Sequence, residues 1–242
     1  MRRSDNTADF FERTAAEFAA NYRSSPEFLE RREVWRCAIE KNLPRSGHPL
    51  LCLDLGCGDG SLSRFLAKRG FKTVGIDQSE AMLSIARHKA VEHEIEGYTE
   101  YIRASLPLSG DLERRYLNSA HVILCSSVLE YLANPEDVLG QFDRILAPGG
   151  VLLISFPNRF SFYRVCEQTL SGILKYTDSY VRHQRYPLTL PHVKQVLNRI
   201  GFTMIDETFF ALPFQRYTEW LFGSHRGNRV ATMVLLVAKK LE

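Results

Sequence analysis

The chain has 242 residues, enough for one large α/β domain. A hydrophobic fraction of 45% and a charged fraction of 24% exclude disordered and fibrous chains. The formal net charge of +3 is too small to indicate, by itself, a partner that is nucleic acid or a membrane surface. No apolar run reaches the roughly 18 residues that span a bilayer, and no signal sequence follows the basic start. We therefore expect a soluble, cytoplasmic protein.

The five cysteines form no C-x-x-C pair and have no histidines nearby at the spacing of a zinc site. Cys52 and Cys125 lie inside apolar runs, where a thiol usually behaves as a small buried hydrophobe. We expect reduced thiols in a reducing compartment, and no metal site.

Two helices are predicted in residues 1–46, before any strand. Phe11, Ala15, Phe18 and Tyr22 recur at the spacing of one apolar helix face. Ser25 followed by Pro26 is a typical start for the second helix. In that helix the apolar residues Phe28, Trp35 and Ile39 are expected on one face, and the basic residues on the opposite face: Arg31, Arg32, Arg36 and Lys41.

From residue 50 onwards, short unbroken apolar runs alternate with helical stretches. The predicted strands are 50–55, 73–76, 121–125, 151–156, 202–209 and 230–238. The predicted helices start near Gly60, Ser79, Asn134 and residue 190. This alternation predicts right-handed β-α-β units and a doubly wound, mostly parallel sheet within a single domain over 1–242. Ligands of such sheets bind at the carboxyl ends of the strands.

A glycine-rich loop, Asp54-Leu55-Gly56-Cys57-Gly58-Asp59-Gly60, directly follows the first strand and opens a helix. Its glycines permit a sharp turn and a close approach of the backbone to a ligand. The third glycine of the dinucleotide fingerprint is replaced by serine in either register, which disfavours NAD. Asp54 is expected at the mouth of the loop, where it would repel a pyrophosphate and attract an ammonium or sulfonium group. The predicted ligand is zwitterionic.

A second carboxylate, Asp77, ends the next strand, 21 residues beyond Gly56. An acid at this position can accept hydrogen bonds from both hydroxyls of a ribose. The predicted ligand therefore combines a ribose with a cationic group.

Residues 51–156 resemble the class I S-adenosylmethionine-dependent methyltransferases, in the branch of ubiquinone-pathway and natural-product enzymes. The resemblance rests on the loop, on Asp77, on the run 124–132 and on Leu146-Ala147-Pro148-Gly149-Gly150. It implies a Rossmann-like, seven-stranded α/β fold with S-adenosyl-L-methionine as cofactor. The residues expected to bind that cofactor are Tyr22, Asp54, Gly56, Cys57, Gly58, Gly60, Asp77, Gln78, Met82, Ser105, Leu106 and Ser126.

Two positions depart from the pattern of these relatives. Many of them carry Gly-Asp-Ala near the end of the third strand, where this chain reads Ala104-Ser105-Leu106. Ser105 or backbone groups are therefore expected to replace the acid that meets the adenine. Where relatives often read Leu-Glu-His, this chain has Leu129-Glu130-Tyr131, which removes one histidine from the vicinity of the transferred methyl group.

The segment 157–191 is rich in aromatic residues and is expected to form a cap over an apolar or aromatic acceptor. The alternative is that its aromatic rings only pack inserted helices onto the domain. His183 is the first candidate for a general base, followed by His192 and Tyr186, with a solvated loop histidine as the alternative. The basic run 182–185 is interpreted as solvated surface, with recognition of an anionic substrate group as the alternative.

The predicted function is methyl transfer to a small-molecule acceptor, with oxygen favoured over nitrogen or carbon. A nucleic-acid methyltransferase is one alternative, but the place of its Asp/Asn-Pro-Pro-aromatic turn reads Ser126-Ser127-Val128-Leu129. A cofactor-binding subunit without catalysis is the other. The expected partner is the small-molecule acceptor, and a homodimer is left open.

Overall fold

The computed structural model describes residues 4–43, 48–159, 161, 188–211 and 231–242, without the side chains of 4–8 and 21–24. Its helices are α1 (Ser4–Ser24), α2 (Pro26–Asn42), α3 (Ser61–Ala67), α4 (Glu80–Glu92), α5 (Gly110–Tyr116), α6 (Pro135–Ile145) and α8 (Leu190–Arg199), with two 3₁₀ turns, η1 (Glu96–Tyr98) and η2 (Leu129–Tyr131). Its strands are β1 (Leu51–Leu55), β2 (Lys72–Asp77), β3 (Thr99–Arg103), β4 (Ala120–Ser126), β5 (Leu146–Pro157), β6 (Phe202–Phe210) and β7 (Met233–Lys240).

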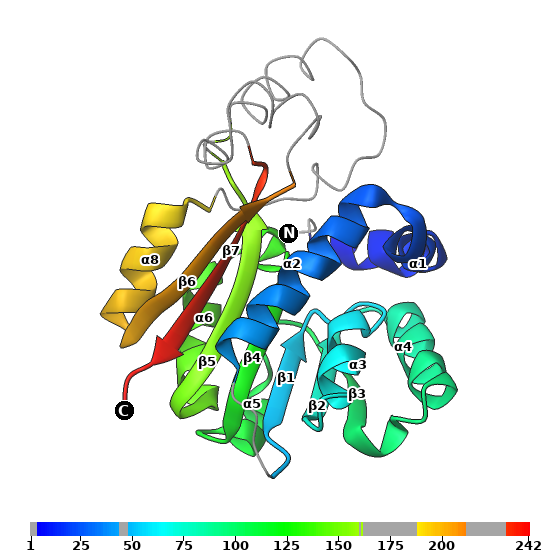
Figure 1. The fold of residues 1–242 in the computed structure, drawn as a ribbon, viewed down its shortest axis with the longest axis horizontal. Coiled ribbons are helices and arrows are strands. Elements are labelled where there is room, and N and C mark those ends of the chain that lie inside the picture. Colours follow the sequence, from blue (N-terminus) through cyan, green and yellow to red (C-terminus); the bar gives the residue numbers. More distant parts are fainter. Residues whose placement is uncertain (1–3, 44–47, 160, 162–187, 212–230) are drawn as a thin grey trace.

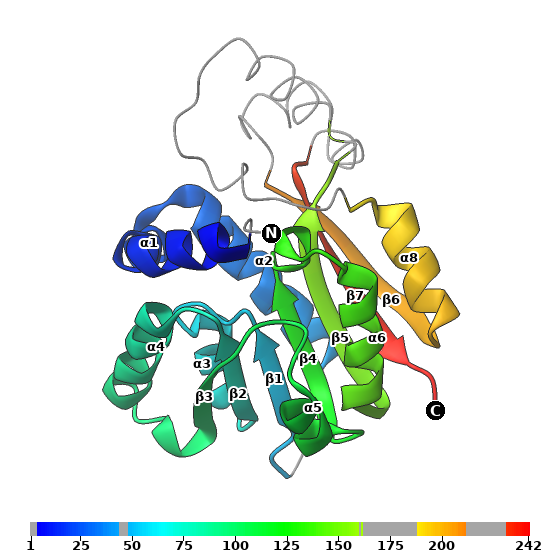
Figure 2. The same ribbon diagram turned by 180° about the vertical axis from the view of Figure 1, so that it is seen from behind.

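These strands form one seven-stranded sheet in the order β3-β2-β1-β4-β5-β7-β6. The pairs from β3 to β5 are parallel, and β7 runs antiparallel to both of its neighbours. Figures 1 and 2 show the sheet between two layers of helices, with α1 lying across the end of the sheet above α4. The predicted doubly wound, mostly parallel α/β fold is confirmed. Among the described helices, none combines the length and apolar character needed to cross a bilayer.

Alternate residues of each central strand pack against opposite helix layers. Val122 and Leu124 of β4 belong to a buried cluster with α2 and α3, whereas Ile123 and Cys125 belong to one with α6 and α8. All four side chains are at most 1% exposed. Because successive side chains of a strand point to opposite faces, a fully apolar strand such as β4 requires a helix layer on each face. The sheet therefore presents its strand ends, rather than its faces, to ligands.

Two predicted helix starts are correct in position but not in capping chemistry. Ser25 and Asn134 precede α2 and α6, each with proline in the first turn, yet neither side chain makes a capping hydrogen bond. Proline supplies the start signal there, because its missing N–H needs no acceptor. Ser79 does cap α4, with its hydroxyl accepting the N–H of Met82.

The first turn of the glycine loop is fixed by a close approach between two strand ends. Gly56 has a φ of +75°, and a Cβ atom there would lie 2.2 Å from Cγ2 of Val128, which follows β4. Any side chain at position 56 would therefore displace Val128 in addition to straining the backbone. Glycine allows the loops after β1 and β4 to meet above neighbouring strands.

Candidate functional site

A cavity of about 720 Å³ lies at the carboxyl ends of the parallel strands. The turns after β1, β2, β3 and β4 contribute to it. The strand ends at Pro157 of β5, Phe210 of β6 and Met233 of β7 also line it. The N-terminal helices contribute Phe11, Phe18, Glu27, Phe28 and Arg31. The volume lies within the range of about 300–1,000 Å³ typical of small-molecule sites.

Asp77 joins the glycine loop to the tip of β2. One carboxylate oxygen accepts the N–H of Gly58 at 2.9 Å, and the other accepts the N–H of Ser79 at 2.9 Å. Burial raises the pKa of Asp77 above its ordinary value, although these backbone hydrogen bonds counteract the shift. Two ionised oxygens have about four acceptor positions, so the carboxylate that shapes the loop still has capacity for two ligand hydroxyls.

Asp54 lies beneath the loop and not at its mouth. Its side chain is 1% exposed and accepts a hydrogen bond of 2.6 Å from the hydroxyl of Ser63 on α3. Burial raises its pKa from 3.8 to about 6. The sequence places Asp54 on the correct strand, but its neighbour in space depends on how α3 packs. This acid faces the small space behind Gly56 and does not line the large cavity.

Asp59 fixes the far end of the loop between two helices. Its carboxylate accepts the N–H of Ser61 at 3.1 Å and forms ion pairs with Lys89 of α4 and Arg64 of α3. The three side chains are only 3%, 13% and 12% exposed, respectively. Because a buried charge is tolerated only when it is paired, this cluster constrains the loop and both helices together.

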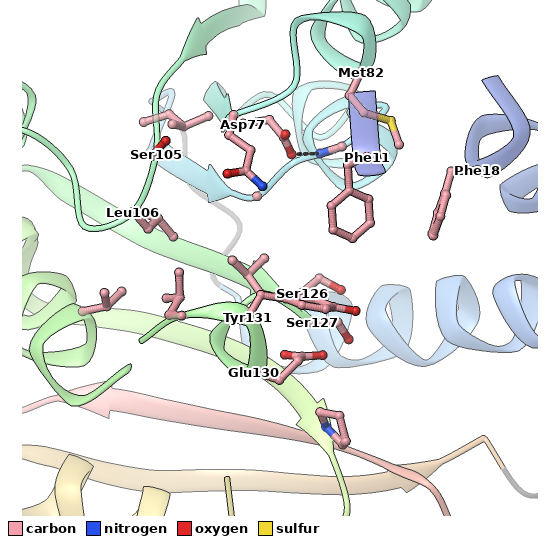
Figure 3. A pocket seen from close by; sticks show the side chains of 18 of the residues that line it. Phe11, Phe18, Asp77, Met82, Ser105, Leu106, Ser126, Ser127, Glu130 and Tyr131 are labelled. Atoms are coloured by element: carbon pink, nitrogen blue, oxygen red, sulfur yellow. Dashed lines mark hydrogen bonds between the residues drawn. The ribbon is translucent and has the colours of Figure 1, made fainter. Parts of the chain in front are cut away.

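The expected adenine side of the cavity is formed by four of the predicted residues: Gln78, Met82, Ser105 and Leu106. Met82 is 4% exposed and comes from the first turn of α4. Figure 3 shows Asp77 and Met82 at one end of the cavity, with Ser105 and Leu106 on the turn after β3. The structure thus brings the predicted adenine-side residues together around one space.

Ser126 lines the cavity as predicted, and Arg31 lies next to it. Nη2 of Arg31 donates a hydrogen bond of 2.7 Å to the Ser126 hydroxyl. The prediction that Arg31 lies on the face of α2 opposite Phe28 is wrong. Arg31 follows Phe28 by three residues, and residues three apart on a helix share a face. Both line the cavity.

Two aromatic residues of α1 line the cavity, whereas the sequence predicts only that they share one apolar face of a helix. Phe11 packs edge-on against Tyr131 at 5.6 Å between centroids and against Phe18 at 5.4 Å. Phe18 in turn lies 6.2 Å from Phe28. Figure 3 shows Phe11 facing Tyr131 across the space. The apolar spacing of residues 11 and 18 indicates a buried helix face. It cannot identify the partner of that face in η2, which lies more than a hundred residues away in the sequence.

Glu12 holds α1 against the start of α4. Its carboxylate accepts hydrogen bonds from the hydroxyl of Ser79 at 2.7 Å and from the N–H of Ala81 at 3.2 Å. A carboxylate at a helix N-terminus also interacts favourably with the helix dipole. The helix that carries Phe11 into the cavity is therefore anchored beside Asp77 and Met82.

The remaining predicted site residues have different placements. Gly56 and Gly58 line the large cavity, whereas Cys57 is buried behind the loop and Gly60 packs against the ring of Tyr101. Burial raises the pKa of the Cys57 thiol well above its ordinary value, which disfavours a reactive thiolate. Gly60 is not among the residues that line either cavity, and a Cβ atom at this position would meet Tyr101 and Ala86.

Tyr22 is part of α1, but its side chain lies outside the described part of the chain, as do His183, Tyr186 and most of the segment 157–191. His192 is described and is not among the residues lining the large cavity. Its Nε2 lies 3.0 Å from Glu136 of α6, which also binds Arg199. His192 therefore joins α8 to α6. Within the described residues, no group of three His, Cys, Asp or Glu side chains is placed to hold a metal ion.

The donors and acceptors around the large cavity match the parts of S-adenosyl-L-methionine. Asp77 offers acceptors for ribose hydroxyls, Met82 offers apolar surface for a base, and Asp54 lies behind the loop that would meet the cationic end. Ser127 lines the same space, and no hydrogen-bond partner for its buried hydroxyl is found in the described residues. Such a group is satisfied when a ligand or water occupies the cavity.

This strand order, with its reversed β7 and its loop–acid pair, defines a class I S-adenosylmethionine-dependent methyltransferase. A family model described as a methyltransferase domain matches residues 28–207, and the chain belongs to that family.

Comparison with individual proteins agrees with this assignment. The chain is 36% identical over 107 residues to ubiquinone biosynthesis O-methyltransferase of Hahella chejuensis, which covers 44% of this chain and 43% of that protein. It is 35% identical over 107 residues to the enzyme of the same name from Alkalilimnicola ehrlichii, covering 44% and 41%. The chain thus spans less than half the length of these two curated relatives.

Among solved structures, a similar one is magnesium protoporphyrin IX methyltransferase from Synechocystis PCC 6803 with bound S-adenosylhomocysteine. The TM-score is 0.72 at 19% identity, and the match covers 98% of this chain and 99% of that chain. At this identity the likeness establishes the fold.

Proposed function

We propose that the chain transfers a methyl group from S-adenosyl-L-methionine to an oxygen atom of an aromatic or apolar small molecule. One observation carries this proposal: the glycine loop, Asp77 and the rings of Phe11, Phe28 and Tyr131 line one continuous cavity. A ligand held at the loop would therefore have its reactive end in the same space as an apolar acceptor.

The acceptor end of the cavity is mainly apolar. Beyond Ser126 it is lined by residues of six elements or turns, among them Leu132, Val138, Pro157, Phe210, Ala211 and Met233. Flat apolar molecules gain from burial against such surfaces, and aromatic rings add edge-to-face contacts. These residues favour a small molecule with a ring or another compact apolar body.

The bound cofactor supplies a methyl group on a positively charged sulfur, and transfer forms an oxygen–carbon bond as the sulfur–carbon bond breaks. The chain contributes alignment and exclusion of water, which are the main needs of an in-line substitution that loses charge. Phe11 and Phe18 cover the cavity from α1, and Arg31 and Ser126 lie beside its loop end. These contacts would hold donor and acceptor in line.

The preference for oxygen is supported by the O-methyltransferases to which the chain is similar over 107 residues. An oxygen nucleophile must lose a proton, which a positioned base can accept. We propose His183 as this base and the segment 157–191 as a cap over the acceptor. Tyr22 is proposed to lie against the cofactor from the end of α1.

The test combines binding with product detection. Isothermal titration is expected to show binding of S-adenosyl-L-methionine, and Asp77→Ala is expected to weaken it. A panel of catechols, phenols, hydroxylated acids, amines, transfer RNA and duplex DNA is then screened for S-adenosylhomocysteine, and products are identified by mass spectrometry. We expect turnover with at least one phenol or catechol.

Each other outcome has a defined meaning. Turnover with a nucleic acid only would replace the small-molecule proposal, and binding without turnover on a wide panel would favour a cofactor-binding subunit. His183→Ala is expected to lower turnover with a phenolic acceptor more at pH 7 than at pH 9, where more of the phenol is ionised. Equal turnover of the variant and wild type at both pH values would reject His183 as base.

A further inference from the structure

Ser127, the first residue after β4, has a backbone conformation that residues with a side chain rarely adopt. Its φ is +54°, in the left-handed region. Serine carries a steric cost there that glycine does not, and strained residues cluster at functional sites. Among the described residues other than glycine that have a positive φ, Ser127 and Ala211 both line the large cavity. An unfavourable conformation thus coincides with the candidate site.

The surrounding structure fixes Ser127 from two directions. Its N–H donates a hydrogen bond of 3.0 Å to the carbonyl oxygen of Ser155 in β5. The next residue, Val128, packs against Gly56 of the glycine loop so closely that a Cβ atom there would lie 2.2 Å from its Cγ2. Ser127 is therefore held between the glycine loop and β5.

The hydroxyl of Ser127 is a buried polar group with unused hydrogen-bonding capacity. Its oxygen is buried, and no partner lies within hydrogen-bond distance among the residues that the structure describes. Buried hydroxyls are nearly always hydrogen-bonded, so one without a partner indicates a ligand or a water molecule. The residue lines the large cavity, and Figure 3 shows it close to Ser126 and Tyr131. The missing partner is therefore expected inside that cavity.

The position of Ser127 in the sheet favours the acceptor as this partner. In the strand order, β4 lies between β1, which carries the glycine loop, and β5. Beyond β4, the cavity is lined by Pro157, Phe210 and Met233 at the ends of β5, β6 and β7. Ser127 thus lies where the loop side of the cavity meets its apolar side. Methyl transfer requires the reactive oxygen of the acceptor to lie at this junction, next to the methyl group.

A hydroxyl is suited to hold an oxygen nucleophile because it can both accept and donate. It accepts the O–H of a neutral phenol, and it can donate to the same oxygen once the phenol is ionised. In the transfer, an electron pair of that oxygen forms the bond to the methyl carbon, and the electron pair of the sulfur–carbon bond stays on sulfur. The proton of the phenol goes to the base proposed above, His183. A hydrogen bond from Ser127 occupies one lone pair of the oxygen and leaves another for the methyl carbon.

We propose that the hydroxyl of Ser127 binds the nucleophilic oxygen of the acceptor and positions it next to the methyl group of the cofactor. This contact selects acceptors with a free hydroxyl group on a ring. The methylated product has no O–H to donate and is held less tightly. The inference rests on the proposed function, because it places the acceptor's oxygen within that site.

The test uses fluorine NMR titrations of 4-fluorophenol and 4-fluoroanisole with the chain saturated by S-adenosylhomocysteine. The two probes share a fluorinated ring, and only the phenol can donate a hydrogen bond from its oxygen. Ser127→Ala removes the hydroxyl and is expected to weaken binding of the phenol about fivefold, while the Kd of the anisole changes by less than about twofold. The Kd of S-adenosylhomocysteine is expected to stay within about twofold of the wild-type value.

Two further variants separate this role from a structural one. Ser127→Gly also lacks the hydroxyl but adopts the positive φ without strain, so it should show the same selective loss even if Ser127→Ala is unstable. Ser155→Ala is the matched control. Ser155 is 0% exposed and lines neither cavity, and its hydroxyl also has no hydrogen-bond partner within the described residues. This control should leave the Kd of both probes unchanged.

The possible failures point to different conclusions. An equal loss for both probes, no loss for either, or a cofactor-loaded wild type that binds neither probe would overturn the role of Ser127. A folded wild-type chain that does not bind S-adenosylhomocysteine would instead overturn the proposed function. The two failures are therefore distinguishable.

Discussion

The backbone N–H of Gly58 donates a hydrogen bond of 2.9 Å to the carboxylate of Asp77. The residue proposed to bind the ribose thus also determines the shape of the loop proposed to meet the methionine end. Two backbone donors, Gly58 and Ser79, already orient the carboxylate of Asp77. A ligand that uses its remaining acceptor positions would therefore bind a side chain that is held in place. Both ends of the cofactor site depend on one side chain.

This dependence predicts the effect of Asp77→Asn. The amide oxygen can accept from one backbone N–H, but the amide nitrogen would face the other donor and leave it unsatisfied. We expect unfolding free energy to fall by about 1–3 kcal/mol and affinity for S-adenosyl-L-methionine to fall by about tenfold or more. Urea unfolding and isothermal titration measure the two quantities. Unchanged stability with unchanged affinity would show that the loop does not need this carboxylate.

The raised pKa of Asp54 leads us to predict opposite pH dependences for the stability of the free chain and for cofactor binding. Its folded pKa of about 6 lies above the ordinary value of 3.8, so the folded chain holds this proton more tightly than the unfolded chain. The stabilisation is complete below about pH 3.8 and is lost as pH rises through about 6, by about 3 kcal/mol at most. Binding of a ligand's ammonium group favours the ionised form, so affinity should rise over the same range.

The control for this prediction is Asp54→Asn, which keeps the acceptor for Ser63 and cannot ionise. Unfolding free energies and cofactor Kd values at pH 5, 6, 7 and 8 are compared between wild type and variant. The variant is expected to lack both trends. A wild-type Kd that stays constant from pH 5 to 8 would contradict the pairing of Asp54 with a ligand cation.

The sequence predicts those parts of the site whose signals are local. Gly56, Gly58 and Asp77 follow strand ends at fixed spacing, and parallel strands bring their carboxyl ends together, so their meeting could be predicted. The same holds for Ser126 after β4. In each case the strand pattern supplies the position, and the following loop supplies the chemistry.

Contacts that depend on how helices dock could not be predicted. Asp54 turns toward Ser63 because α3 packs on that face of β1, and Arg31 enters the cavity because of the rotation of α2 about its axis. The short helix α5 has few apolar positions and was missed as an element. Local periodicity is compatible with several dockings, and tertiary packing selects among them.

The hydrogen bonds of Glu12 to the start of α4 lead us to predict that docking of α1 controls exchange of the cofactor. Glu12→Ala removes two hydrogen bonds at the start of α4 and should weaken docking of α1 by about 1 kcal/mol, a factor of about five in its opening equilibrium. We expect faster amide hydrogen exchange in α1 and faster dissociation of S-adenosyl-L-methionine in stopped-flow displacement. Glu17→Ala is the matched control, since Glu17 is an exposed acid on the same helix. Equal effects of both variants would contradict a specific role for Glu12.

The ion pair between Lys89 and Asp59 leads us to predict that this buried cluster contributes separately to stability and to cofactor binding. Lys89→Met keeps much of the side chain's apolar length but leaves Asp59 with Arg64 as its remaining ion-pair partner. We expect a loss of about 1–3 kcal/mol in unfolding free energy, together with weaker cofactor binding, because Asp59 also accepts the N–H of Ser61 at the end of the loop. Lys72→Met, at an exposed lysine of β2, is the control and should change neither quantity. Lys89→Arg should restore most of the affinity, since it returns a cation to Asp59. If Lys89→Met lowered the unfolding free energy but left cofactor affinity unchanged, the cluster would stabilise the helices without shaping the loop.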